Sequence, residues 1–297
     1  MAPTRCIAGF WRRLLALVID VVLISIPGFL LGSIFYDFFS HSSLWAAVLG
    51  LVITLPYFAI LGSSIGEGQT LGHRCTGIEV VNGDGSHLSI GKSVLRYTIL
   101  LLSLGFAGAL LPAYMAYPVG MASITILYLY LFNIRTRQTL HDVATGSFVV
   151  KALGIGAVGE PRLWRGHWVA LGALLTIAVI AISLLTRTRP FPELAAVQRS
   201  LIDSGQFQEV GVTLQTHYPG SKTDLHLIVK CKNRPADYDK AAKDIVTSVE
   251  SVDPRASELD FISVDFKEGF NVGLATYSTT KRVSHTPSEW ETIARAN

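Results

Sequence analysis

The segment FWRRLLALVIDVVLISIPGFLLGSIFY, residues 10–36, places one acidic residue, Asp20, inside a long apolar run. About 20 apolar residues, each rising about 1.5 Å along a helix, cross the hydrocarbon core of a bilayer, which is about 30 Å thick. A carboxylate at that depth costs about 3 kcal/mol or more, so it needs a partner, a proton or water. The segment therefore predicts a membrane-spanning helix with an acid in its interior.

Charge is scarce and unevenly distributed along the 297 residues. Charged residues make up 16% of the chain and hydrophobic residues 50%, whereas soluble domains are about 25% charged. Residues 1–186 hold 11 of the 25 Lys and Arg and 7 of the 22 Asp and Glu. This asymmetry predicts a membrane region followed by a soluble domain with a balanced surface. The three cysteines are isolated, which favours neither a zinc site nor a disulfide framework.

Apolar runs predict five membrane spans, at about residues 14–36, 44–62, 94–111, 113–132 and 168–185. The third and fourth spans are separated by a tight turn at Pro112. If the N-terminus is cytoplasmic, all eleven basic residues of this region fall on the cytoplasmic side, as the positive-inside rule requires. Five crossings then place residues 187–297 on the outer side of the membrane. Residues 156–186 form a linker and the fifth span.

Two segments of the membrane region are similar to each other. Residues 69–81 align without gaps to residues 138–150, with seven of thirteen positions identical. Each segment follows two predicted spans, so we expect a duplicated two-span unit related by a pseudo-two-fold axis along the membrane normal. Chance or shared local chemistry is the alternative. The repeat motif consists of three residue pairs: Gln69 and Gln138, Thr70 and Thr139, Gly77 and Gly146.

Local propensities predict what the repeated segments form. Thr70 and Thr139 are suited to cap short helices, and Gly77 and Gly146 to end them in a left-handed conformation. Residues 77–90 predict a β-hairpin around the Asn-Gly-Asp-Gly turn. Residues 146–151 would add a third strand, which makes a small cytoplasmic β element.

These motifs together resemble a known family. The resemblance rests on residues 8–14 (AGFWRRL), 68–72 (GQTLG), 95–97 (LRY) and 138–142 (QTLHD). In this order they are similar to the RDD family of bacterial integral membrane proteins, over residues 7–151. The resemblance implies that Arg13, Asp20 and Asp142 are the arginine and two aspartates of the family's name, with Arg12 competing for the arginine role. It also implies a bacterial cytoplasmic membrane location and a transport role, with sodium/proton exchange proposed for some members.

The candidate charge site comprises six residues: Arg13, Asp20, Arg74, Arg96, His141 and Asp142. Asp20 has two interpretations: a proton- or cation-responsive carboxylate, or a structural ion pair with Arg13, Arg12 or Arg96. His141 and Asp142 are expected at the cytoplasmic interface, either as a proton relay or as a hydrogen-bond network in which Asp142 accepts backbone N–H groups or pairs with Arg74. No catalytic residue, metal site or cofactor is predicted.

The sequence after residue 187 predicts a small α+β domain with a core of its own. Helices are expected at residues 193–204, 236–251 and 288–294, the last with Ser288 as its N-cap. Paired strands are expected at residues 210–216 and 225–230, and a second hairpin at residues 259–266 and 272–279 around residues 267–269. Without a catalytic cluster or a strongly basic face, the domain is interpreted as a module that binds a protein partner and no nucleic acid.

The sequence thus predicts an α-helical integral membrane protein with a pseudo-symmetric four-span core in residues 1–155, a fifth span and a C-terminal α+β domain. The leading functional hypothesis is ion-coupled transport or permeation of a monovalent cation or proton through the core. The alternative is a non-transporting scaffold or assembly factor in the lipid bilayer, whose outer domain recruits a partner. An enzyme ranks third, because no nucleophile–base pair or metal set is present.

Overall fold

The computed structural model describes residues 5–105, 115–154, 156–158, 163–187, 192–217 and 222–295. The chain forms two compact units, one of residues 1–183 and 270–276 and the other of residues 184–269 and 277–297. Residues 106–114, which include the predicted turn at Pro112 and parts of the third and fourth predicted spans, lie outside the described residues, as does the turn at 218–221.

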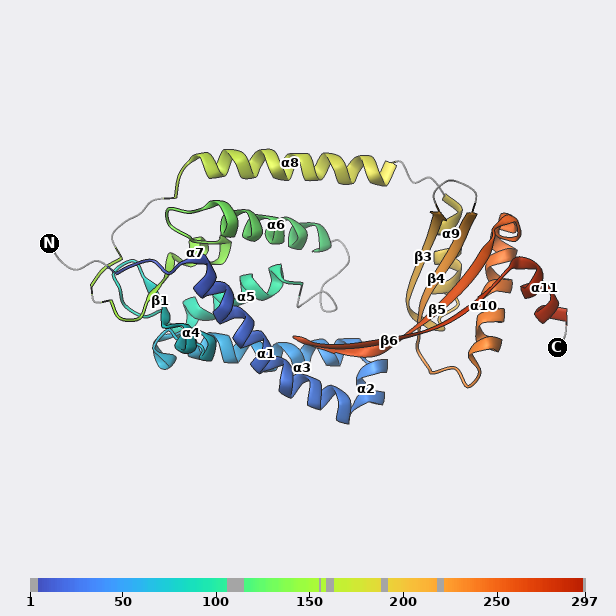
Figure 1. The fold of residues 1–297 in the computed structure, drawn as a ribbon, viewed down its shortest axis with the longest axis horizontal. Helices are drawn as coiled ribbons and strands as arrows, with labels where there is room; N and C mark the ends of the chain where they lie inside the picture. The colour runs from blue at the N-terminus through green and yellow to red at the C-terminus, as the bar shows by residue number, and fades with distance from the viewer. Residues whose placement is uncertain are drawn as a thin grey trace. The chain divides into compact units, whose positions relative to one another are not determined.

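The first unit is mainly helical, with one small sheet (Figure 1). Its elements are α1 (Phe10–Ile34), α2 (Tyr36–His41), α3 (Ser43–Leu61), a 3₁₀ turn (Ser64–Gly66), α4 (Leu71–Thr76), β1 (Ile78–Asn82), α5 (Ile90–Ser103), α6 (Ala116–Phe132), α7 (Leu140–Thr145) and β2 (Ser147–Lys151). Helix α8 (Gly166–Arg187) follows. A separate helix, α2, begins at Tyr36, where the sequence predicted the end of the first span.

Helix α1 is inverted relative to a helix of a water-soluble protein. Its buried face carries residues three or four apart: Arg13, Ala16, Asp20 and Ile24. Its exposed face carries large apolar side chains: Leu15, Val18, Val22 and Ile26. Charged groups inside and apolar groups outside suit a helix surrounded by lipid, because the interior supplies hydrogen-bond partners that lipid cannot.

Two helices in the described part of the chain are long and apolar enough to cross a bilayer, α1 and α3. Two further apolar helices, Tyr117–Phe132 and Gly166–Ala181, are shorter. They coincide with the fourth and fifth predicted spans. Helix α5 is shorter still and carries Lys92 in its first turn.

The small sheet differs from the predicted hairpin. β1 pairs with β2, which lies about 70 residues later in the chain, and not with residues 88–90. Residues 88–90 are unavailable as a strand because the Ser89 hydroxyl accepts a hydrogen bond from the Lys92 N–H at 3.5 Å and caps α5. An isolated bridge between Val81 and His87 and the hydrogen bond from the Asn82 N–H to the Ser86 carbonyl at 2.7 Å remain of the predicted pairing.

The register of β1 and β2 has a two-fold character. Val80 is paired with Val149, its own counterpart in the repeat, and Ile78 is paired with Lys151 while Asn82 is paired with Ser147. A two-fold axis through the centre of an antiparallel pair requires this reciprocal arrangement. Side-chain contacts repeat as well: the Gln69 amide donates to the Ile78 carbonyl at 3.0 Å, and the Gln138 amide to the Ser147 carbonyl at 2.9 Å.

The helix caps also repeat between the two segments. Thr70 lies at the N-cap of α4, where its hydroxyl accepts from the His73 N–H at 3.2 Å. Thr139 precedes α7, and its N–H donates to the Asp142 carboxylate at 3.2 Å. Gly77 and Gly146 end the two helices with φ of 65° and 62°. Only glycine adopts this conformation at little cost, so the sequence could place both helix ends.

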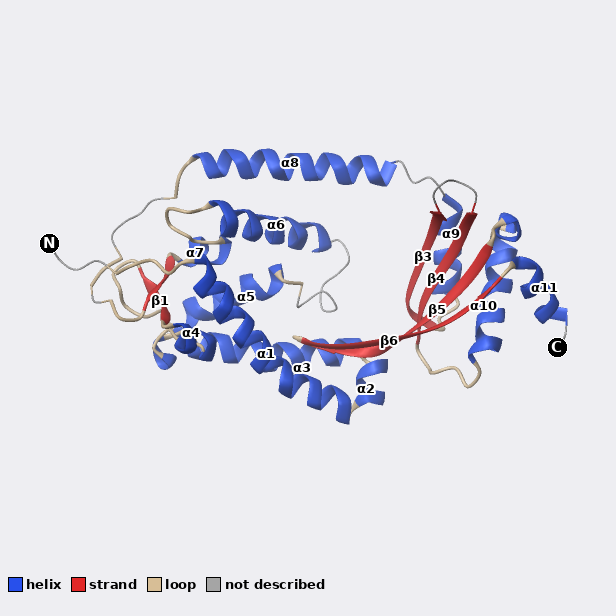
Figure 2. Cartoon of the chain, in the orientation of Figure 1, coloured by secondary structure: helices blue, strands red, loops and turns tan. Residues whose placement is uncertain are grey.

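The second unit is a sheet covered by helices (Figure 2). Its strands are β3 (Phe207–His217), β4 (Lys222–Cys231), β5 (Phe261–Val272) and β6 (Ala275–His285), in that order across the sheet. β3 and β4 are antiparallel, whereas β4 and β5 are parallel. Helices α9 (Pro192–Asp203), α10 (Tyr238–Val252) and α11 (Pro287–Arg295) and a 3₁₀ turn (Pro254–Glu258) complete the unit.

One face of this sheet forms the core of the second unit. Leu225, Leu227 and Val229 alternate along β4 and are fully buried with residues of α9 and α10. Alternation with period two directs these side chains to one side, as the sequence predicted for this strand. The unit therefore has its own apolar core.

Two predicted details of the second unit are wrong. The second hairpin does not turn at residues 267–269; β5 continues to Val272, and Gly273 adopts a φ of 65° in the turn that follows. The last helix is capped by Thr286 and not by Ser288. The Thr286 N–H donates to the Glu289 carboxylate at 2.9 Å, and the Thr286 hydroxyl accepts from the Glu289 N–H at 3.4 Å. This reciprocal pair, two residues earlier than expected, satisfies two backbone groups at once.

The β1–β2 register can be tested by crosslinking. In a background with Cys6, Cys75 and Cys231 replaced by serine, the double variant Val80→Cys, Val149→Cys should form an intramolecular disulfide on mild oxidation, because directly opposed Cβ atoms lie about 4.5–5.5 Å apart. The control pair Val80→Cys, Val150→Cys should stay reduced, since neighbouring strand residues point to opposite faces. Equal crosslinking of both pairs, measured by gel mobility, would contradict the register.

Candidate functional site

Asp142, on the short helix α7, is the centre of a buried polar network. It is 1% exposed. Its Oδ1 accepts from Nε and Nη2 of Arg96 at 3.0 and 2.8 Å. Its Oδ2 accepts from the Thr139 N–H at 3.2 Å and lies 3.6 Å from Nη1 of Arg13. One carboxylate therefore serves two guanidinium groups and the first turn of its own helix.

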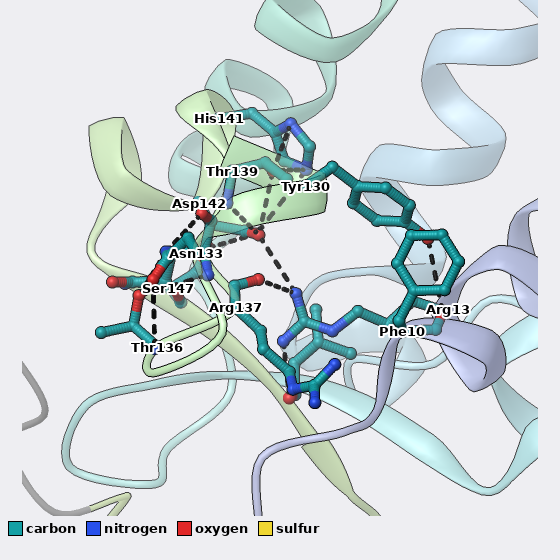
Figure 3. A network of polar contacts seen from close by, with 12 residues as sticks. Phe10, Arg13, Tyr130, Asn133, Thr136, Arg137, Thr139, His141, Asp142 and Ser147 are labelled. Carbon is teal, nitrogen blue, oxygen red and sulfur yellow. Dashed lines mark hydrogen bonds and ion pairs between the residues drawn. The ribbon is translucent and has the colours of Figure 1, made fainter. Parts of the chain in front are cut away.

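Arg13 reaches this centre from α1 (Figure 3). Its Nη1 also donates to the Arg137 carbonyl, and its Nη2 donates to the Val149 carbonyl at 3.0 Å. Side chains on a helix lean toward its N-terminus, so the Arg13 guanidinium extends away from Asp20, which lies two turns later, and toward α7 and β2. Arg12 is exposed, and its Nη1 donates to the Thr76 carbonyl at 3.1 Å. Of the two candidates, Arg13 is the arginine of the buried network.

The predicted ion pair of Asp20 is wrong. No arginine among the described residues lies within ion-pair distance of Asp20, which is 1% exposed. Its Oδ1 accepts from the Tyr57 hydroxyl at 2.6 Å and from the Gly72 N–H at 2.7 Å, and its Oδ2 accepts from the Thr70 hydroxyl at 2.6 Å. Thr70 and Gly72 at the start of α4, together with Tyr57 of α3, replace the expected guanidinium, and both arginines contact Asp142 instead.

The two repeat copies differ where they meet the spans. In the first copy Gly72 lies against α1, and a Cβ added there would be 2.1 Å from the Ala16 carbonyl oxygen and 2.9 Å from the Asp20 carboxyl carbon. The counterpart of Gly72 in the second copy is His141. The counterpart of Asp142 is His73, whose Nδ1 is buried without a hydrogen-bond partner. In the first copy, Gly72 leaves room for the acid on the long helix α1, Asp20. In the second copy, the acid is on the short helix α7, where Asp142 contacts Arg96 of α5.

Both acids line one cavity inside the first unit. It has a volume of about 320 Å³, and its polar lining includes Arg13, Asp20, His73, Arg96, His141 and Asp142. The remaining lining is mostly apolar and comes from α1, α3, α5 and α6. Five of the six candidate residues that the sequence singled out therefore converge on one space.

Arg74 does not belong to this site. Its side chain is exposed on α4, whereas the Asp142 carboxylate that it was expected to meet is occupied by Arg96 and Arg13. Sequence reasoning also missed Tyr57, which donates to Asp20 and accepts from the Leu71 N–H at 3.2 Å. The only signal for Tyr57 was a hydroxyl in the second predicted span, one residue after Pro56.

Burial keeps the two histidines neutral. It lowers the pKa of His141 from 6.5 to about 4, although the adjacent Asp142 carboxylate opposes this. It also lowers the pKa of His73, to about 3, and the Arg96 and Arg13 guanidinium groups add to that effect. For Asp142 burial acts to raise the pKa, but Arg96, His141 and Arg13 outweigh it and hold the pKa below its ordinary value. The short helices thus contribute one negative charge.

Comparison with known proteins places the membrane unit in a family. The RDD family model matches residues 7–146. The chain is 30% identical over 117 residues to the uncharacterized protein YxaI of Bacillus subtilis, covering 77% of that protein and 32% of this chain. It is 29% identical over 146 residues to the uncharacterized protein YckC of the same organism, covering 85% of that protein and 49% of this chain. No solved structure matches the chain.

The chain belongs to the RDD family, as its motifs indicated. The family is membrane-associated, and the two long apolar helices and the inverted face of α1 agree with a membrane protein that also carries a soluble domain. The matched range contains every charged residue of the cavity. The second unit lies outside it.

Replacing Asp142 should destabilise the protein strongly. Asp142→Asn leaves Arg13 and Arg96 buried without a counter-charge, which costs about 3–5 kcal/mol. Denaturant unfolding of the purified protein in detergent measures this loss. Glu67→Gln removes an exposed carboxylate in the same unit and should change the free energy of unfolding little. A loss below about 1 kcal/mol for Asp142→Asn, the size of an exposed ion pair, would contradict the central role of Asp142.

Stability should also depend on pH through His141. The unfolded chain binds a proton at His141 below about pH 6.5, whereas the folded protein does so only near pH 4, so stability is full above pH 6.5 and falls between these values. The slope is about 1.4 kcal/mol per pH unit for one histidine. Unfolding measured from pH 7.5 to 4.5 should show a shallower decline for His141→Gln than for the wild type, while His41→Gln, at an exposed position, should follow the wild type.

Proposed function

We propose that the membrane unit carries out proton-coupled transport, with the cavity as the substrate site and Asp20 as the carboxylate that exchanges the proton. The observation that carries this proposal is the cavity of about 320 Å³ lined by Arg13, Asp20, Arg96 and Asp142. Ionisable side chains at membrane depth that face a common cavity are typical of substrate and ion pathways.

The surroundings of Asp20 support proton exchange. Tyr57 and Thr70 donate to its two oxygens, and each hydroxyl also accepts a backbone N–H, from Leu71 and His73 respectively. A hydroxyl rotates and can act as donor or acceptor. A protonated Asp20 could therefore donate to Thr70, whose hydroxyl would then turn from donor to acceptor.

Charge balance favours a proton over a metal cation at this site. Arg13 and Arg96 supply two positive charges and Asp20 and Asp142 two negative ones. The cavity is also lined by four other titratable residues: His73, His141, Tyr97 and Tyr130. Near neutral pH the histidines are unprotonated and the tyrosines are protonated, so these side chains carry no charge. A sodium ion would meet a carboxylate already filled by three donors and two nearby guanidinium groups. A proton needs no such coordination shell.

The topology predicted from the sequence is part of this proposal. Four spans before residue 135, a fifth span over α8 and a cytoplasmic N-terminus would put residues 187–297 outside the cell. The apolar segments of α6 and α8 and the placement of basic residues support it. The repeated caps and the reciprocal β1–β2 register support a duplicated two-span unit.

A second candidate is the scaffold role, in which the outer unit recruits a protein. Its support is that the unit has a sheet with its own apolar core outside the family match. This role and transport are compatible in one chain.

Proton movement through the protein can be measured in reconstituted vesicles. Wild-type protein should dissipate an imposed pH gradient, reported by a trapped fluorescent dye, faster than empty vesicles. Asp20→Asn should return the rate to that of empty vesicles, because the amide retains an acceptor oxygen but binds no exchangeable proton at neutral pH. Asp37→Asn, at an exposed position outside the cavity, should behave as the wild type.

Thermal unfolding of Asp20→Asn in detergent separates a transport defect from misfolding. A folded variant without flux supports the proposal. Wild-type flux equal to that of empty vesicles, or unchanged flux in Asp20→Asn, would overturn it and leave the scaffold role as the remaining candidate.

A further inference from the structure

The cavity has a polar end and an apolar end. Along α5, Arg96, Leu100 and Leu104 follow at four-residue spacing and all line it. Along α6, Ser123, Leu127 and Tyr130 line the opposing wall. Residues four apart share a helix face, so the cavity follows both helices for about two turns, or roughly 12 Å. Charged groups gather at the Arg96 end and aliphatic groups at the Leu104 end.

The polar end has unused hydrogen-bonding capacity. Nε of Arg13 is buried without a partner among the described residues, although Nη1 and Nη2 are engaged. Nδ1 of His73 is also buried without a partner. A buried N–H of a guanidinium left unpaired costs about 1–3 kcal/mol or more. Both residues line the cavity, so an acceptor group placed at this end would satisfy the unpaired N–H of Arg13.

The apolar end reaches the surface of the unit. Leu104 is 48% exposed and Leu127 is 59% exposed, although both line the cavity. Leu127 lies on the apolar helix α6, and Leu104 directly follows the last turn of α5. An exposed apolar side chain at such a place in a membrane protein suits contact with acyl chains. The opening therefore suits entry of an apolar chain from the bilayer, with the charged end buried beyond it.

We propose that the cavity binds a membrane amphiphile with one anionic head, a carboxylate or a phosphate, and a single apolar chain. The head lies at Arg13 and Arg96, and the chain lies between α5 and α6 toward Leu104 and Leu127. This assignment names the substrate class of the transport site proposed above and rests on that function for its biological meaning. A cavity of about 320 Å³ is within the size range of small-ligand sites.

Charge complementarity selects an anion over a neutral or cationic head. Asp142 offsets one of the two guanidinium groups by direct contact. The second negative charge, on Asp20, is turned toward Tyr57, Thr70 and Gly72 at the start of α4. When Asp20 takes up a proton, the cavity retains one net positive charge, which an anionic head balances. Uptake of the proton and binding of the amphiphile should therefore favour each other.

Native mass spectrometry of the full chain in a neutral maltoside detergent tests binding directly. The probes are dodecanoate and dodecyl phosphate, with dodecanol as the uncharged match and acetate and inorganic phosphate as heads without a chain. We expect one saturable dodecanoate or dodecyl phosphate per chain. The affinity for dodecanol should be lower by a factor of about ten or more, since a hydrogen bond to a charged group contributes about 1.5–3 kcal/mol.

Two matched variants locate the chain of the ligand. Leu127→Trp fills the apolar end of the cavity without touching the charged network, and it should lower dodecanoate binding at least tenfold. Leu131→Trp is one turn further along α6, is 51% exposed and does not line the cavity, so binding should be unchanged. Both substitutions are at exposed positions, and thermal unfolding checks that both proteins are folded.

Three results would overturn the inference. The first is equal binding of dodecanol and dodecanoate, and the second is unchanged dodecanoate binding in Leu127→Trp. The third is binding of acetate or phosphate as tight as that of the amphiphiles, which would identify the ligand as a soluble anion. Each leaves the proposed function standing if proton flux persists. Absent flux with saturable amphiphile binding would instead overturn the transport function and keep the ligand assignment.

Discussion

The membrane unit depends on one constraint: a guanidinium group buried in lipid surroundings must find acceptors within the protein. For Arg13 and Arg96 the acceptor is Asp142 on the six-residue helix α7. The N–H of Thr139, at the start of α7, donates to the Asp142 carboxylate and fixes its position. Helix α1, helix α5 and the sheet strand β2 are thereby connected through a single carboxylate and the carbonyl groups beside it. Apolar packing in lipid is weakly directional, so these polar contacts decide which helices are neighbours.

The duplicated architecture makes the two acids complementary and not equivalent. One copy places its acid on the long helix and donors on the short helix, and the other places its acid on the short helix and an arginine on the long helix. Gly72 and His141 occupy the same repeat position and decide which arrangement fits, because Gly72 lies against the α1 backbone where no side chain has room. A symmetric fold thus encloses an asymmetric charge distribution, which is what a cavity with one polar end requires.

Several features could be predicted from sequence because they depend on local rules. Gly77 and Gly146 end helices through their backbone freedom, Thr70 caps through a short side chain, and the burial of Asp20 follows from the length of its apolar run. The family was recognisable for the same reason, since its motifs are short and ordered.

Long-range pairing could not be predicted in this way. Asp20 was expected to take an arginine, but the choice between Asp20 and Asp142 depends on which way Arg13 extends from its helix and on where β2 lies. The partner of β1 was assigned to the adjacent residues 88–90, whereas Ser89 begins a helix and the partner strand is in the other repeat copy. Tyr57 is a further case, because nothing in the sequence around a tyrosine in an apolar span indicates which acid its hydroxyl contacts.

The hydrogen bonds of Arg13 to the carbonyls of Arg137 and Val149 cross 124 and 136 residues of chain. Ribosomes extend a chain at about 5–20 residues per second, so roughly 6–27 s separate the synthesis of this arginine from that of its acceptors. During that interval the Arg13 guanidinium lacks both of these acceptors. The buried network around it can therefore be completed only after the second repeat has been made.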